Sequence, residues 1–88
     1  MIDMKQAVQI AKRQGAELLG TTNLSLEEVE RTKYNRRDAW MITLSHPLSS
    51  VEGPFAGLGR ASRDYKRFYI DMQSGELLAM KLREVAAA

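Results

Sequence analysis

The sequence predicts an α+β fold, in which one N-terminal helix packs on an antiparallel sheet of three or four strands arranged as two hairpins. Two periodicities predict it: apolar residues recur at helical spacing near the N-terminus and at every second position in later segments. A chain of 88 residues has room for one shared core. We therefore expect residues 1–88 to form a single domain.

The predicted helix covers about residues 3–19. Asp3 and Gln6 have the spacing of a capping box, in which the acidic side chain accepts from a free amide of the first turn. Gly15 either lets the helix lie close to the sheet or marks an early end, and Gly20 is the expected C-terminal cap. The apolar stripe that faces the sheet consists of Ala7, Ile10, Ala11, Gly15, Leu18 and Leu19.

Four strands are expected, over about residues 26–34, 39–46, 64–72 and 77–84. The first is ambiguous, because Ser25 and Glu28 also fit the cap of a short helix, whereas Val29 and Thr32 suit a strand. The others alternate apolar and polar side chains, and Gly75 supplies the turn before the last strand. The residues expected to be buried against the helix are Trp40, Ile42, Leu44, Phe68, Ile70, Leu78 and Met80.

A long loop, residues 47–63, separates the two predicted hairpins. Several glycine and proline residues interrupt regular structure there, and few apolar side chains are available for burial. Loops longer than about 12 to 15 residues are uncommon in compact domains and are usually functional or disordered. We expect residues 48–62 to be the most mobile internal segment, with fast amide exchange, and to take part in partner contacts.

No catalytic, metal-binding or cofactor-binding motif is evident, so we predict a non-enzymatic protein without a cofactor. The absence of cysteine excludes disulfides, thiolate chemistry and the usual structural zinc sites. The one histidine, His46, stands at a strand end with no apparent catalytic partner, and Glu27, Glu28 and Glu30 are interpreted as a solvated strand edge. Asp71 is expected to fix the following turn by accepting backbone amides.

The chain shows neither a secretory signal nor a membrane span. Charged side chains interrupt residues 1–20, and no apolar run approaches the roughly 18 residues of a spanning helix. The expected location is the cytoplasm, unless a signal or anchor has been removed. The net charge of +2 is too small to identify a nucleic-acid binder.

The last predicted hairpin reads Phe-Tyr-Ile-Asp-Met-Gln-Ser-Gly-Glu-Leu-Leu over residues 68–78. It resembles the strand, Asp-x-x-[Ser/Thr]-Gly-Glu turn and strand of PepSY and PepSY-like domains, and Ala7, Ile10 and Ala11 resemble the opening helix of that family. The resemblance implies a helix packed on an antiparallel sheet, and a role in binding and inhibiting peptidases or in sensing at cell envelopes. Small bacterial toxin-immunity families share a similar hairpin, so an immunity protein is an alternative.

The sheet face turned away from the predicted helix combines aromatic and basic side chains. Such a surface suits a protein partner, because Tyr and Arg dominate binding hot spots. It also suits stacking of single-stranded nucleic acid, although the small net charge favours a protein. A homodimer through a sheet edge or this face is a further alternative. The candidate contact residues are Met41, Tyr65, Arg67, Tyr69, Lys81 and Arg83.

Overall fold

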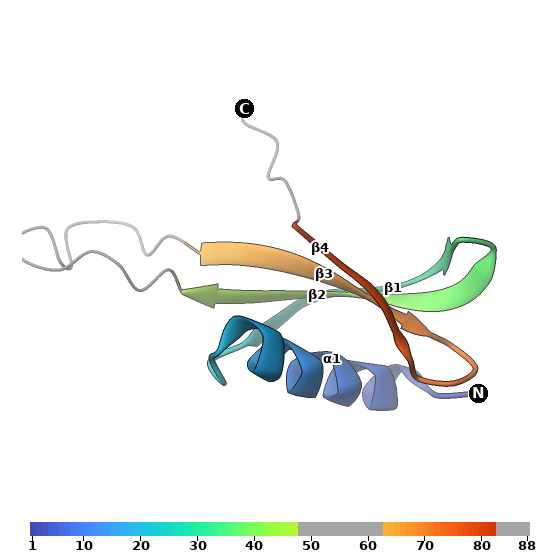
Figure 1. Ribbon diagram of the computed structural model, residues 1–88, viewed down its shortest axis with the longest axis horizontal. Helices are drawn as coiled ribbons and strands as arrows, with labels where there is room; N and C mark the ends of the chain where they lie inside the picture. The colour runs from blue at the N-terminus through green and yellow to red at the C-terminus, as the bar shows by residue number, and fades with distance from the viewer. Residues whose placement is uncertain (48–62, 83–88) are drawn as a thin grey trace, which may run out of the picture.

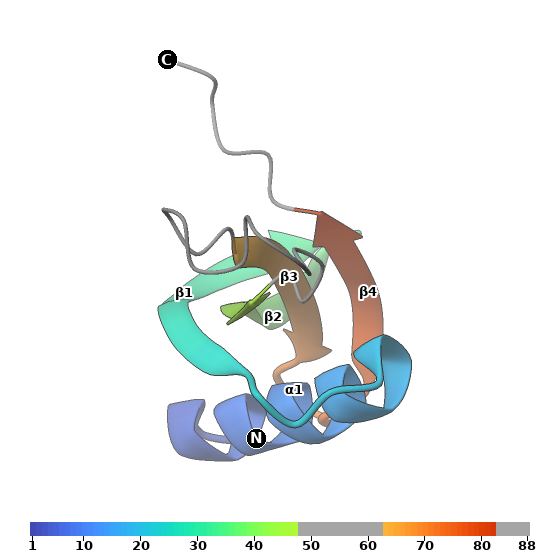
Figure 2. The ribbon, with the colours of Figure 1, turned by 90° about the vertical axis from the view of Figure 1, so that its left-hand side faces the viewer.

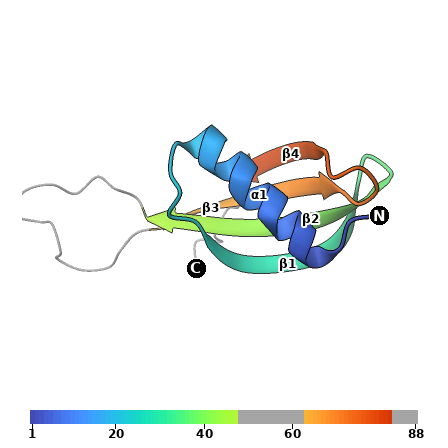
Figure 3. The ribbon, with the colours of Figure 1, turned by 90° about the horizontal axis from the view of Figure 1, so that it is seen from below.

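The computed structural model describes residues 1–47 and 63–82. Helix α1 (Met4–Leu19) is followed by strands β1 (Ser25–Tyr34), β2 (Arg37–Pro47), β3 (Arg63–Asp71) and β4 (Leu77–Leu82). The strands form one antiparallel sheet in the order β1-β2-β3-β4, and α1 crosses one face of it diagonally (Figures 1 and 3). The predicted α+β fold is confirmed.

The strands depart from their predicted bounds mainly at the turns. Asn35 and Arg36 adopt positive φ angles of 48° and 68°, so only these two residues join β1 to β2, and β2 begins earlier than expected. Strand β1 is confirmed as a strand, which settles the ambiguity of that segment. The expectation of mobility for residues 48–62 lies outside the described residues, as do residues 83–84 of the last predicted strand.

Helix α1 begins and ends where capping chemistry predicts. Asp3 Oδ1 accepts a hydrogen bond from the Gln6 backbone N–H at 2.8 Å, and Gln6 Oε1 accepts one from the Asp3 backbone N–H at 2.9 Å. The capping box is therefore complete. At the other end Gly20 takes the left-handed conformation, with φ 68°, that ends many helices.

Gly15 lets α1 lie close to the sheet, as one of the two sequence alternatives proposes. A Cβ atom at this position would lie 3.0 Å from Leu24 Cδ1 and 3.1 Å from Phe68 Cζ. Ala11 and Ala7, one and two turns earlier, are also completely buried. A line of small side chains thus sets the distance between the helix and the sheet.

The variant Gly15→Val is expected to lower the free energy of unfolding by about 2 kcal/mol, because its side chain must displace Leu24 or Phe68 from a packed position. Chemical denaturation measures the loss. Gln9→Val, at an exposed position of α1, is the control for the cost of a β-branched residue in a helix. Equal losses in the two variants would contradict a close contact at Gly15.

The hydrophobic core lies between α1 and the sheet face that it covers. Five of the predicted core residues are buried there: Trp40, Ile42, Leu44, Phe68 and Ile70. The prediction for Met80 is wrong, because its side chain is 36% exposed. Met80 lies opposite Phe68 on the last strand of the sheet, and α1 packs mainly against the other three strands.

The prediction that Leu78 belongs to the core is also wrong. A β-bulge shifts the register so that Tyr69 lies opposite Ala79 while Ile70 lies opposite Leu77. Leu77 therefore packs against the core. Leu78 is the extra residue of the bulge, and it lines a surface depression beside Tyr34, Asn35 and Arg37.

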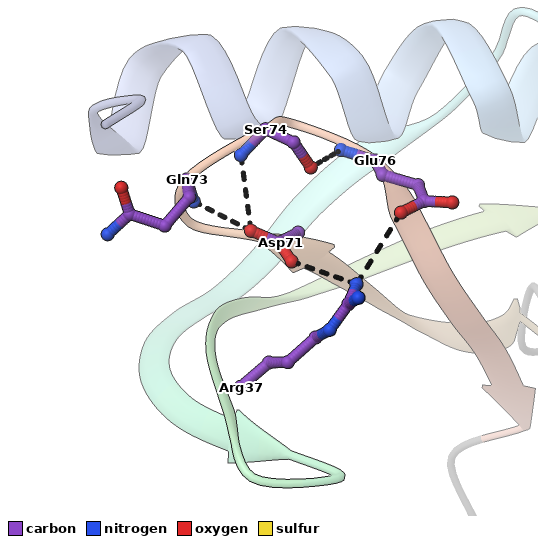
Figure 4. Close-up of polar contacts among 5 residues, drawn as sticks. All are labelled: Arg37, Asp71, Gln73, Ser74 and Glu76. Carbon is purple, nitrogen blue, oxygen red and sulfur yellow. Dashed lines mark hydrogen bonds and ion pairs between the residues drawn. The ribbon is translucent and has the colours of Figure 1, made fainter.

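The turn between β3 and β4 is built around Asp71 (Figure 4). Its Oδ1 atom accepts hydrogen bonds from the backbone N–H groups of Gln73 at 2.7 Å and Ser74 at 3.1 Å. Its Oδ2 atom accepts one from Arg37 Nη1 at 3.2 Å, and the same nitrogen lies 3.5 Å from Glu76 Oε2. The predicted structural role of Asp71 is confirmed.

Acidification is expected to weaken this turn. The amide of Gln73, followed by that of Ser74, holds the pKa of the Asp71 carboxyl below its ordinary value. The unfolded chain therefore takes up the proton at higher pH than the folded one. The contribution of Asp71 to stability is complete above the unfolded pKa of about 3.9 and is lost as the pH falls through the folded pKa.

Thermal unfolding of wild type and Asp71→Asn between neutral pH and low pH tests this expectation. The unfolding midpoint of the wild type should exceed that of Asp71→Asn at neutral pH, and the difference should shrink at acidic pH. Asp38→Asn, at an exposed position, is the control for loss of a carboxylate. A difference between wild type and Asp71→Asn that does not change with pH would contradict the role given to the ionised carboxylate.

Candidate functional site

The candidate site is the sheet face opposite α1, which we call the outer face. Within the described part of the chain no other element covers it (Figures 1 and 2). The antiparallel register and the two-residue alternation of each strand place its side chains in rows across the sheet. Two central rows are Glu28, Thr43, Arg67 and Lys81, and Glu30, Met41, Tyr69 and Ala79.

Four of the six predicted contact residues are brought together on the outer face. Tyr65, Arg67 and Tyr69 project from β3 at alternating positions, and Lys81 lies directly opposite Arg67 on β4. The three β3 side chains are half-buried rather than fully exposed. Arg83 lies outside the described residues.

Met41, the fifth of these residues, is buried. It belongs to the outer face of β2, but its side chain is only 7% exposed. Thr43 and Ser45 on the same face are completely buried. Met41 therefore lies beneath the surface of the candidate site and offers little area to a partner.

An aromatic and cationic cluster stands on the outer face. The rings of Tyr34 and Tyr69 are 5.0 Å apart between centroids and inclined at 33°, although they come from β1 and β3. Their rows lie on either side of Ala39 in β2, whose small side chain leaves room between them. Lys81 Nζ lies 5.0 Å from the Tyr34 centroid and 5.7 Å from the Tyr69 centroid, within range of a cation–π interaction.

Tyr34 is a site residue that sequence reasoning missed. Unbroken alternation places it on the outer face with Glu30 and Thr32, because the register shift of β1, between Leu26 and Glu28, lies before all three. The turn at Asn35 follows directly, so Tyr34 also reads as the end of a strand. Its partner Tyr69 is distant in the sequence, and only the strand order brings the two rings together.

A polar cluster ties the first three strands together at the other end of the outer face. Ser45 Oγ donates to Glu27 Oε2 at 2.6 Å, and Arg63 Nε donates to Ser45 Oγ at 3.0 Å. Arg63 Nη2 also donates to Ser25 Oγ at 3.2 Å. Glu27 is exposed, as predicted, but it is hydrogen-bonded rather than merely solvated.

Two donor atoms at the centre of the outer face have no hydrogen-bond partner among residues 1–47 and 63–82: Thr43 Oγ1 and Arg67 Nε. They lie in directly opposed residues of β2 and β3. A buried polar group that lacks a partner costs about 1–3 kcal/mol. Thr43 is completely buried, so these two atoms lie beneath the surface that a partner would contact.

His46 belongs to an ion-pair cluster on the other face of the sheet. Its Nε2 atom lies 3.5 Å from Asp64 Oδ2, and Lys66 Nζ lies 2.8 Å from the same oxygen. The hydrogen bond from Lys66 holds the pKa of the Asp64 carboxyl below its ordinary value. Because His46 and Asp64 are opposed residues, the cluster joins β2 to β3 near the strand ends.

The described residues show neither a metal site nor a membrane-spanning helix. In the described ranges, 1–47 and 63–82, no group of three or more His, Cys, Asp or Glu side chains is placed to hold a metal ion. The helix described there is too short and too polar to cross a membrane. No family model, curated protein or solved structure matches the chain.

Proposed function

We propose that this protein is a small non-enzymatic binding module that contacts a protein partner through its outer face. One observation carries the proposal: aromatic and cationic side chains gather on the sheet face that α1 leaves uncovered. Tyr and Arg are enriched in binding hot spots, where a few residues supply most of the affinity. The proposed contact residues are Tyr65, Arg67, Tyr69 and Lys81.

The arrangement of these side chains lowers the cost of binding. Tyr69 contacts Tyr34, and Lys81 Nζ lies over both rings; all three residues belong to paired strands. Each rotatable side chain that a partner must immobilise costs about 0.5–1.5 kcal/mol. Side chains that are already packed against one another lose less freedom on binding, so the cluster is suited to act as an anchor.

The chemistry of the outer face favours a partner surface that carries hydrogen-bond acceptors. In the row that runs from Glu28 on β1 to Lys81 on β4, the basic residues Arg67 and Lys81 lie at the β3 and β4 end. The acidic Glu28 lies at the opposite end. We expect carboxylate or carbonyl groups of the partner over β3 and β4.

A protein partner is favoured over single-stranded nucleic acid by the position of Lys81. Stacking of bases needs an accessible aromatic face. The faces of Tyr34 and Tyr69 already contact each other and Lys81 Nζ, so a base would have to displace these contacts. A peptidase inhibitor and a toxin-immunity protein are both forms of such a module, with the peptidase or toxin as the partner.

The test is a pull-down from the native host with wild type and the variant Tyr65→Ala/Arg67→Ala/Tyr69→Ala, after circular dichroism has shown that both are folded. The outer-face variant is expected to recover at least tenfold less partner than wild type, because truncation of hot-spot residues removes most of the affinity. The matched control is Lys5→Ala/Lys12→Ala/Arg13→Ala, which removes exposed cations from α1.

Two outcomes would overturn the proposal. Retention of every specific partner by the folded outer-face variant would contradict the site. A hydrolase or transferase activity that disappears on mutation of His46 would contradict the non-enzymatic class. Salt-sensitive binding of single-stranded DNA that the outer-face variant loses would favour the nucleic-acid alternative instead.

A further inference from the structure

The two edge strands of the sheet differ in how they oppose pairing with another strand. Strand β1, of ten residues, carries the charged residues Glu27, Glu28, Glu30, Arg31 and Lys33. Strand β4, of six residues, carries only Lys81. Charged side chains on an edge strand are a common protection against strand addition. Strand β4 is protected only by its short length and by Lys81, and therefore less than β1 with its five charged side chains.

The β4 edge also exposes apolar side chains. Met80 is 36% exposed and Leu82 is 59% exposed, and the register places both on the side of the sheet that faces α1. The C-terminal turn of α1 lies on the β4 side of the sheet, as Figures 2 and 3 show, and this turn carries Leu18, which is 54% exposed. Apolar side chains that gather beside an uncovered strand are typical of an interface.

We propose that the β4 edge pairs with the β4 edge of a second copy of this chain, in antiparallel orientation about a two-fold axis near Met80. This register places Met80 opposite its own counterpart, and Ala79 opposite Lys81 of the other copy. The two lysines are therefore not directly opposed. Each Lys81 also remains packed on tyrosine rings of its own chain.

A second copy fits β4 because β4 is complementary to itself, whereas β1 is not. Directly opposed residues in an antiparallel pair lie on the same face. A two-fold axis at Glu30 of β1 would oppose two Glu30 side chains, and an axis at Arg31 would oppose two Arg31 side chains. An axis at Val29 would oppose Glu28 to Glu30. Like charges in directly opposed positions destabilise a strand pair, so self-pairing is less favourable at the β1 edge than at the β4 edge.

The pairing has a structural consequence for the outer face. A two-fold axis perpendicular to the sheet continues it across both copies, from four strands to eight. It also turns both outer faces to the same side. The dimer then presents two equivalent surfaces, and a partner with two matching sites gains avidity. The dimer itself does not depend on the proposed function of the outer face.

The absence of native cysteine makes cross-linking a direct test. Opposed Cα atoms in an antiparallel pair are about 4.5 or 5.5 Å apart, which is within the range of about 4.4–6.8 Å for disulfides. Met80→Cys is expected to form a disulfide-linked dimer at least tenfold faster than Leu26→Cys under mild oxidation. Leu26 is the matched control, because it is an apolar residue of the β1 edge and 44% exposed.

Sedimentation equilibrium supplies the second measurement. Met80→Lys is expected to raise the dimer dissociation constant at least tenfold, because two lysines would then face each other, while Leu26→Lys should leave it unchanged. Cross-linking of Met80→Cys no faster than that of Leu26→Cys would overturn the proposal, as would a dimer insensitive to Met80→Lys. The outer-face variant should still dimerise, so the failure of one proposal is distinguishable from the failure of the other.

Discussion

The variant Trp40→Ala is expected to lose about 3–5 kcal/mol of the free energy of unfolding. Trp40 is only 5% exposed and belongs to the core between α1 and β2. Its Nε1 atom donates to the Ile2 carbonyl oxygen at 3.2 Å, and the Arg31 guanidinium lies 5.4 Å from the ring centroid. The substitution therefore opens a large cavity and also releases the segment that precedes the helix.

Chemical denaturation followed by circular dichroism measures this loss, since Trp40 is the one tryptophan and its fluorescence disappears with it. Trp40→Phe is the matched control. It keeps most of the buried apolar surface and loses the hydrogen bond, so a smaller loss is expected. An unchanged denaturation midpoint in Trp40→Ala would contradict the register that directs Trp40 towards the helix.

Phe68→Ala is expected to be comparably destabilising, by about 3–5 kcal/mol. The side chain is completely buried at the centre of β3, and its Cζ atom lies 3.1 Å from the position of a Cβ on Gly15. It is thus the sheet residue that lies nearest to Gly15 on α1. Denaturation of Tyr69→Ala, the half-buried neighbour on the outer face, should show a smaller loss.

A double-mutant cycle tests the contact itself. Phe68→Leu removes the end of the ring and leaves space beside Gly15, so Gly15→Val should cost less in that background than in wild type. Residues in contact typically show interaction energies of about 0.5–3 kcal/mol. Additive losses in the two variants would contradict direct packing of Phe68 against Gly15.

The parts of the fold that depend on local chemistry could be predicted from the sequence. The capping box at Asp3 and the glycine at the end of α1 act within a few residues, so their spacing alone identifies the helix. The alternation in β2 and β3 identifies both strands for the same reason. The turn at Asp71 likewise depends on backbone amides two and three residues away.

The errors arise where contacts between distant residues override local pattern. Alternation alone directs Leu78 into the core, but the bulge in β4 gives that place to Leu77. Alternation also predicts that side chains on the face away from the helix are exposed, whereas Met41 on that face is buried. The contact between Tyr34 and Tyr69 depends on strand order, which no short sequence window contains.

The resemblance to PepSY-like domains stays a prediction. The Asp71 turn on which it rests is present, but carboxylate capping of a hairpin turn is a general device, so its presence does not identify a family. The fold itself also hosts many functions. The outer face and its side chains therefore carry the functional proposal.

Binding at the outer face is tested most directly by NMR titration of the ¹⁵N-labelled protein with the partner recovered in the pull-down. We expect amide shift changes in β3 and β4, centred on Arg67, Tyr69 and Lys81, with α1 unchanged. Shift changes confined to α1, around its exposed Lys5 and Lys12, would contradict the proposal.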